Sequence, residues 1–194
     1  MKNFFAEFGR AIAATIFFAI ILCGIYPLIV FGVAQTFFPH QANGSLLVDK
    51  SGAIRGSALL AQNFTGAKYF HPRPSANNFD AENSGGSNLG PTSAKLAAEI
   101  SQRIAAYRAE NHLPANAIVP ADAVTASASG LDPDISLANA EIQIPRVAKA
   151  HGISEKQLRK IVRQNTHGRD LGIFGEPRVN VMTLNFALGA LGGK

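Results

Sequence analysis

The fold of this chain is decided by one stretch, AIAATIFFAIILCGIYPLIVFGVA, which runs from Ala11 to Ala34 without a charged side chain. At about 1.5 Å per residue, a helix of this length reaches about 36 Å, enough to cross a hydrocarbon core of about 30 Å. A helix satisfies its own backbone hydrogen bonds, so it needs no partner to be stable in lipid. The sequence therefore predicts a single transmembrane helix over residues 11–34.

Two other interpretations of this stretch are weaker. The apolar region of a cleavable signal peptide is typically about 7–15 residues long, and this run is longer. Its small residues Gly32 and Ala34 make a poor cleavage site. A buried helix of a globular protein averages about 11–12 residues and would normally carry a polar face, which is absent here.

The charges that flank the apolar stretch predict its orientation. Lys2 and Arg10 precede it, whereas the next basic residue after it is Lys50. Basic residues favour the cytoplasmic side of a membrane. We therefore expect residues 1–10 in the cytoplasm, residues 11–34 in the bacterial inner membrane, and residues 35–194 as one extracytoplasmic (periplasmic) domain.

Tyr26 and Pro27 lie inside the predicted span and are candidate partner-binding residues. Proline lacks a backbone N–H and disturbs the preceding helical turn. The feature has two interpretations, a tolerated kink or a bend shaped to a partner helix.

Composition limits the possible partners of the remaining chain. Past Pro39 it holds 16 Lys and Arg against 12 Asp and Glu, and these residues are spread out. A nucleic-acid-binding protein usually gathers its basic residues on one face, so no nucleic-acid partner is expected. The single cysteine, Cys23, lies in the span, which excludes a disulfide framework and a site made of several thiolates.

The residues after the span predict a mixture of short strands and helices. The mixture lacks a strict strand–helix alternation, which indicates an α+β domain. The expected strands are 44–49 and 53–60, with a turn at 50–52, and residues 123–130 are a buried strand or a tight extended segment. The expected helices run from about Pro91 to Asn111, over 136–151, from Ser154, and from a cap at Asn180, with a turn at 175–178. Ser136 is an N-cap candidate together with Asp132 and Asp134, Gly152 ends that helix, and Ser154 forms a capping box with Gln157.

The segment FHPRPSA, residues 70–76, is a further candidate site. Two prolines bracket Arg73, so the segment is predicted to be extended and stiff. Phe70 and Arg73 are candidate partner-binding residues at such an edge. The alternative, which we favour, is a loop that only pins its aromatic residues in the core.

A glycine-rich loop, NSGGSNLGPT, follows at residues 83–92. A glycine-rich loop that leads into a helix can bind an anion through free backbone N–H groups. The phosphate-binding pattern GxxxxGK[ST] is absent, so we favour glycines that permit tight turns. The candidate nucleotide- or partner-binding residues of this loop are Ser84, Gly85, Gly86, Ser87, Asn88 and Gly90.

The residues do not require an enzyme, and we expect no catalytic residue. None of the five histidines lies in an HExxH motif, and no GxSxG elbow occurs. A Ser-His-Asp site could still assemble in space from the serines of the small-residue loops, so a membrane-anchored hydrolase remains an alternative.

Six blocks of sequence, in one order, carry a family resemblance. They closely resemble the C-subunit family of bacterial Kdp-type potassium-transporting ATPases, and the likeness spans nearly the whole chain. The blocks are YPLIVFGVAQTFFP, FHPRPSA, SGGSNLGPT, AVTASASGLDPDIS, RVAKAHG and GEPRVNVMTLNFAL.

The resemblance implies membership of a four-subunit complex. Its other members are a channel-like potassium-binding subunit, a P-type ATPase subunit and a small membrane peptide. The complex uses ATP and potassium, whereas this chain is expected to hold no metal or cofactor of its own. The resemblance also implies a single span with the large domain outside, which agrees with the charge argument.

Two roles are open under this resemblance. A catalytic chaperone would raise the ATP affinity of the pump subunit, and SGGSNLG, which looks like the signature loop of ABC transporters, would then contact the nucleotide. A loop outside the membrane cannot reach cytoplasmic ATP, so we favour a clamp. In that role the helix holds the channel and pump subunits together and affects ATP affinity only at a distance.

Overall fold

The computed structural model describes residues 2–191, with side-chain positions for residues 4–189. The chain divides into two units, Met1–Ser45 and Leu46–Lys194. The described elements of the first unit are all helical, and the second unit mixes helices with antiparallel strands. The predicted α+β class, with one long apolar helix near the N-terminus, is confirmed.

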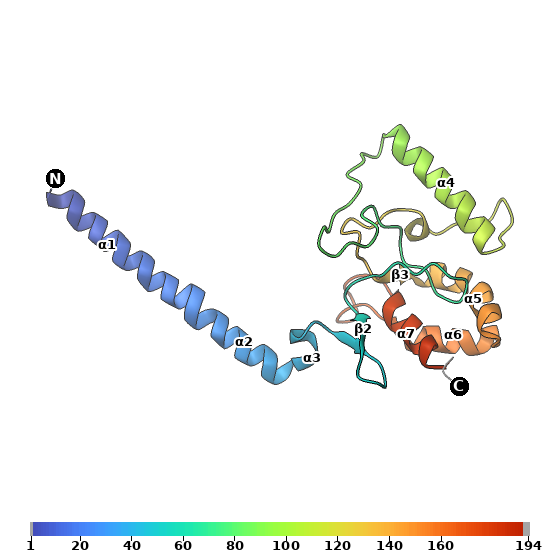
Figure 1. Cartoon of the computed structure of the whole chain (residues 1–194). Coiled ribbons are helices and arrows are strands. Elements are labelled where there is room, and N and C mark those ends of the chain that lie inside the picture. The colour runs from blue at the N-terminus through green and yellow to red at the C-terminus, as the bar shows by residue number, and fades with distance from the viewer. Residues whose placement is uncertain (1, 192–194) are drawn as a thin grey trace. The chain divides into compact units, whose positions relative to one another are not determined.

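The apolar stretch lies in one long run of helix, which Figure 1 draws in blue. The run consists of α1 (Lys2–Ala19), the π-helix η1 (Ile20–Ile25) and α2 (Tyr26–Phe37). Within the described residues, Phe4–Phe37 is the one helix that is long and apolar enough to cross a membrane. Helix α2 ends at Phe37 because Phe38 leaves the helical region, with φ at −135°.

Pro27 is accommodated by a wide turn of helix. Inside a regular helix its ring would collide with the carbonyl four residues earlier. In η1 the hydrogen bonds span five residues, as between the Tyr26 N–H and the Ile21 carbonyl. Pro27 then takes one of the first positions of α2, where a missing N–H costs little.

A short helix, α3 (Pro39–Ala42), follows the long helix. The side-chain amides of Gln35 and Asn43 face each other across this corner at 3.3 to 3.5 Å. Asn43 also donates to the Pro39 carbonyl at 2.6 Å. The bond from Asn43 satisfies a backbone carbonyl of α3, and the bonds between the two amides connect the end of α2 to the residue that follows α3.

The second unit begins with a hairpin of β1 (Leu46–Val48) and β2 (Ile54–Ser57), paired antiparallel. The predicted turn is confirmed, with Gly52 at φ +83°. Asp49 accepts from the backbone and hydroxyl of Ser51 and lies 2.6 Å from an Arg55 nitrogen. These bonds hold the pKa of Asp49 well below its ordinary value.

Helix α4 (Ala94–Glu110) begins later than predicted. Ser93 is its N-cap and accepts from the Leu96 N–H at 3.4 Å. Pro91 was expected in the first turn and instead lies in the turn that precedes the cap. The serine fixes the start because its hydroxyl can replace a missing helical acceptor, which proline cannot do.

Of the two interpretations of residues 123–130, a buried strand or a tight extended segment, the strand is wrong. A 3₁₀ turn, η2 (Ala121–Ala123), opens the segment, and the rest is irregular. Its backbone pairs with loops and not with a sheet, since the Ser127 N–H donates to Pro74 O and Ser129 O accepts from Gly85 N–H. Small residues allowed this close approach of loops, and their pattern resembles that of a buried strand.

A small antiparallel sheet supports the C-terminal half of the domain. Its strands are β3 (Asp134–Ser136), β4 (Thr166–His167) and β5 (Arg178–Asn180), in the order β3-β5-β4. Ile135 pairs with Val179, and Thr166 pairs with the same residue from the other side.

Three helices pack against this sheet, and their predicted caps are confirmed. Helix α5 (Leu137–His151) is capped by Ser136 and ends at Gly152, with φ at +65°. The Ser154 side chain accepts from the Gln157 N–H at the start of α6 (Glu155–Gln164). Asn180 accepts from the Thr183 N–H at the start of α7 (Val181–Leu191).

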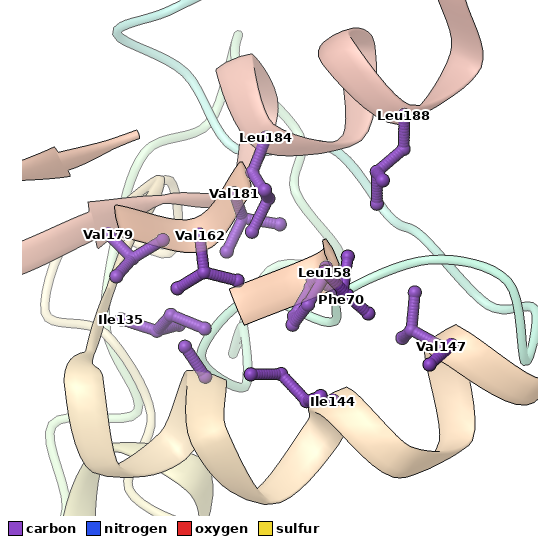
Figure 2. Close-up of a cluster of buried hydrophobic side chains, with 12 residues drawn as sticks. Phe70, Ile135, Ile144, Val147, Leu158, Val162, Val179, Val181, Leu184 and Leu188 are labelled. Carbon is purple, nitrogen blue, oxygen red and sulfur yellow. The ribbon is translucent and has the colours of Figure 1, made fainter. Parts of the chain in front are cut away.

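The core lies between the sheet and these helices. Figure 2 shows side chains from β3, β5, α5, α6 and α7 converging on Phe70, which comes from the loop after the hairpin. This core anchors that loop to three helices. Its buried members are Phe70, Ile135, Ala140, Ile144, Val147, Ala148, Leu158, Val162, Val179, Val181, Leu184 and Leu188.

Candidate partner-binding surfaces

The long helix presents an apolar surface along its length. None of the residues in its candidate membrane span is buried against the rest of the chain. The hydroxyls of Thr15 and Thr36 donate back to the carbonyls of Ala11 and Gly32, so they need no outside partner. This surface therefore suits lipid or the helices of other membrane proteins.

Tyr26 and Pro27 lie where η1 meets α2. Tyr26 is 62% exposed and presents its ring to the surroundings. A single turn of π-helix inside an α-helix, called a π-bulge, frequently occurs at functional sites. A contact between these two residues and a partner helix stays a prediction.

Phe70 is fully buried, so its side chain offers no surface to a partner. The favoured interpretation, a loop that pins an aromatic residue in the core, is confirmed for this residue. Asn185 from α7 accepts from the Phe70 N–H and donates to the Phe70 carbonyl, both at 2.8 Å. One side-chain amide thus pairs with this backbone as a neighbouring strand would.

A second side-chain amide pairs with the backbone of the next residue, His71. Gln143 from α5 accepts from the His71 N–H at 2.7 Å and donates to the His71 carbonyl at 3.2 Å. Gln143 and Asn185 are both almost completely buried. Together they fix the two residues that precede Pro72, which explains why this loop holds one path without a strand partner.

Arg146 is the central cation beneath this loop. Its side chain is 5% exposed. Its guanidinium donates to the carbonyls of Ala67 and Tyr69, each at 3.0 Å. It also donates to Asn111 Oδ1 at 3.1 Å and to Gln143 Oε1 at 2.8 Å. Burial lowers the pKa of Arg146, which the neighbouring Glu110 opposes.

His71 and Glu110 complete this network beside a cavity of about 460 Å³. His71 Nδ1 lies 2.8 Å from Glu110 Oε1, and His71 Nε2 lies 3.1 Å from the Gly66 carbonyl. The hydrogen bond from His71 is the main cause that lowers the pKa of Glu110. Because these polar groups bond to one another and to the backbone, their arrangement serves to fix the loop on α4 and α5.

The Arg73 side chain forms its ion pair within its own domain. It forms an ion pair with Asp132 at 2.9 Å, and its side chain is 28% exposed. Its Nε atom is buried and has no hydrogen-bond partner within the described residues. Arg73 therefore pins its loop to the start of the segment that leads into β3, and a contact with a partner stays a prediction.

The glycine-rich loop packs against the segment 127–130. The Gly85 N–H donates to the Ser129 carbonyl at 2.9 Å, and the Ser84 hydroxyl donates to the same oxygen at 3.0 Å. A Cβ on Gly86 would lie 2.9 Å from the Ala128 carbonyl oxygen. The close approach of two backbones is the reason that glycine is needed here.

The packing of the glycine-rich loop argues against anion binding at a helix end. The candidate residues are Ser84, Gly85, Gly86, Ser87, Asn88 and Gly90. The Gly85 N–H already has an acceptor, and α4 begins only at Ala94 behind its own serine cap. The loop therefore does not deliver a ligand directly to a free helix end. Ser87 and Asn88 are exposed and remain available for contact with another molecule.

Ser127 and Ser129 bond to each other and to the backbone. Ser127 Oγ and Ser129 Oγ lie 3.1 Å apart, and each also accepts from a backbone N–H. No group of three or more His, Cys, Asp or Glu side chains that could hold a metal occurs within residues 2–191.

Sequence reasoning missed the residues that organise the loop, namely Glu110, Gln143, Arg146 and Asn185. They are distributed over three helices, with Gln143 and Arg146 both on α5. The one available signal was that polar residues interrupt the apolar faces of α5 and α7. A polar residue on a buried face normally has a partner, although the sequence does not identify it.

Comparisons with known proteins agree along nearly the whole chain. A family model described as "KdpC: K+-transporting ATPase, c chain" matches residues 8–190. The "Potassium-transporting ATPase KdpC subunit" of Mycobacterium tuberculosis (strain ATCC 25618 / H37Rv) is 52% identical over 183 residues, covering 93% of this chain and 96% of that protein. The proteins of the same name from Nitratidesulfovibrio vulgaris and Acidobacterium capsulatum are each 50% identical; the alignments cover 95% and 92% of this chain, and 94% and 95% of those proteins.

Proposed function

The chain belongs to the KdpC family, the c chain of K+-transporting ATPases, and from this premise we propose that it is a non-catalytic subunit that assembles the complex. Its helix holds a channel-like potassium-binding subunit and a P-type ATPase subunit together, beside a small membrane peptide. The observation that carries this proposal is the span Phe4–Phe37, whose residues are unburied in the chain alone. The second unit has its own core and does not need the helix to bury its apolar residues.

We further propose that this chain raises the ATP affinity of the pump from a distance. A subunit can change a remote affinity only if it interacts differently with two states of the complex. Coupling of this kind is typically worth about 5- to 150-fold in affinity. The polar network around Arg146 gives the outer domain a fixed shape with which to make such a distinction.

The assembly role is tested by exchanging the helix for another one. Residues 11–34 are replaced by a polyleucine span of equal length, with Lys2 and Arg10 kept. The variant remains anchored, and we expect the channel and pump subunits to separate from it during purification in detergent. The Michaelis constant for ATP should rise about 5- to 150-fold.

The matched control is the unaltered full chain, which should copurify with both subunits. A stable complex with unchanged ATP dependence in the helix-exchange variant, or in a strain that lacks this chain, would refute the assembly role.

The orientation is a separate proposal, with the N-terminus in the cytoplasm and the second unit outside. It rests on Lys2 and Arg10 before the helix and no basic residue after it until Lys50. We expect Ser87→Cys to react with a membrane-impermeant thiol reagent in intact spheroplasts, because Ser87 is exposed. The unsubstituted chain, with Cys23 in the span, is the control for background labelling.

Labelling only after lysis would reverse this orientation. It would place the Ser84–Gly90 loop on the side where ATP is found and would favour direct contact with the nucleotide. Labelling from outside excludes that contact and leaves the indirect effect on ATP affinity.

A further inference from the structure

The connection between β4 and β5 ends in an exposed apolar tip, which we define as Leu171, Ile173 and Phe174. Their side chains are 89%, 68% and 60% exposed. Three large apolar side chains within four residues form a cluster, unlike the single exposed apolar residues that are normal on a protein surface. The tip takes no part in the core.

Backbone hydrogen bonds close the loop that carries the tip, although the side chains of the tip are exposed. Asp170 and Phe174 exchange two backbone hydrogen bonds of 2.8 and 2.9 Å, and the Gly172 N–H donates to the Arg169 carbonyl at 3.0 Å. Below the tip, Arg169 donates to both carboxylate oxygens of Glu176 at 2.8 Å. A surface held in one conformation before binding loses less freedom when a partner contacts it.

Leu171 is also held in an unfavourable backbone conformation. Its φ is +54°, a region in which residues other than glycine, asparagine and aspartate are uncommon. The fold thus tolerates both backbone strain and the exposure of a leucine at one position. Such strain clusters at binding sites, where the surrounding structure maintains it.

The charges beside the tip favour a protein partner over a lipid surface. Three carboxylates, those of Asp134, Asp170 and Glu176, surround the guanidinium groups of Arg169 and Arg178. These groups are ion-paired and leave one carboxylate in excess, so they give no attraction to anionic headgroups. A preformed turn does not improve binding to a fluid lipid surface, which has no fixed shape. It does improve binding to a protein pocket of complementary shape.

We propose that the 171–174 tip docks into an apolar pocket on another subunit of the same ATPase complex, with Leu171 as the central contact. This inference rests on the proposed assembly function and adds a contact outside the membrane span. A pocket that is rimmed by basic groups would complement the carboxylates beside the tip.

Photocrosslinking in the intact complex tests the contact. Benzoylphenylalanine is placed at position 171 of the full chain and, as the matched control, at position 118, because Ile118 is 90% exposed on a different loop. We expect a covalent adduct with another subunit from position 171 and none from position 118. Adducts with lipid alone, or equal yields from the two positions, would overturn the inference.

A second variant separates docking from folding. Leu171→Asn removes the apolar side chain and relieves the strain, since asparagine tolerates positive φ. We expect the melting temperature of the chain to stay equal or rise, while the fraction of the chain that copurifies with the other subunits after dilution falls about tenfold or more. Ile118→Asn should leave that fraction unchanged, and equal fractions for all three chains would overturn the inference.

The crosslinking experiment also distinguishes this inference from the assembly role. A chain that copurifies with the other subunits but gives no protein adduct from position 171 overturns the docking tip alone. A chain that does not copurify at all overturns both.

Discussion

Replacing Arg146 with methionine is expected to lower the free energy of unfolding of the second unit by about 3–5 kcal/mol. The variant keeps most of the side-chain volume and removes every donor. It leaves the carbonyls of Ala67 and Tyr69 and the side-chain oxygens of Asn111 and Gln143 without this partner, in a largely buried site. Unpaired buried acceptors cost more than the bond itself contributes.

The measurement is denaturant unfolding of the full chain in detergent, followed by near-ultraviolet circular dichroism of its tyrosines and phenylalanines. Arg159→Met is the matched control, because Arg159 pairs with Glu141 and Glu155 at an exposed position on α6. Exposed pairs contribute little, so the control should unfold nearly as the parent does. Equal losses in the two variants would mean that the buried network does not organise the domain.

The features that the sequence predicted are those that depend on neighbouring residues. The apolar span needs only its own composition, and the caps Ser136, Ser154 and Asn180 each accept from the N–H three residues later. The turn at Gly52 is equally local. In each case the physical cause and its effect lie within a few positions of the chain.

The features that the sequence missed depend on distant residues. Arg146 bonds to a loop that lies almost eighty positions earlier, and Asn185 pairs with Phe70 across 115 positions. No local pattern identifies such partners, because an isolated polar residue on a helix is normally exposed. The strand interpretation of residues 123–130 was wrong for the same reason. The small residues of this segment pack against the glycine-rich loop, which is distant in the sequence, and not in a sheet.

The contact between segment 127–130 and the glycine-rich loop can be tested with Gly130→Ala, for which we expect a large loss of stability. Gly130 has φ at +71°, and an added Cβ would lie 2.1 Å from Asn77 Oδ1 and 2.9 Å from the Gly85 carbonyl oxygen. Left-handed strain and overpacking together should cost roughly 2–5 kcal/mol. Because Asn77 also donates to the carbonyls of Asp80 and Asn83, its displacement should release the glycine-rich loop.

Gly152→Ala separates the two causes, because Gly152 has a similar φ of +65° and nothing lies within 4 Å of its added Cβ. It should show only the strain, about 1–2 kcal/mol. Hydrogen exchange provides the local readout, since the Gly85 N–H donates to Ser129. That amide should exchange faster in Gly130→Ala than in Gly152→Ala. Equal exchange and equal stability would mean that the loop keeps its shape without this contact, and the glycines would then need another explanation, such as ligand binding.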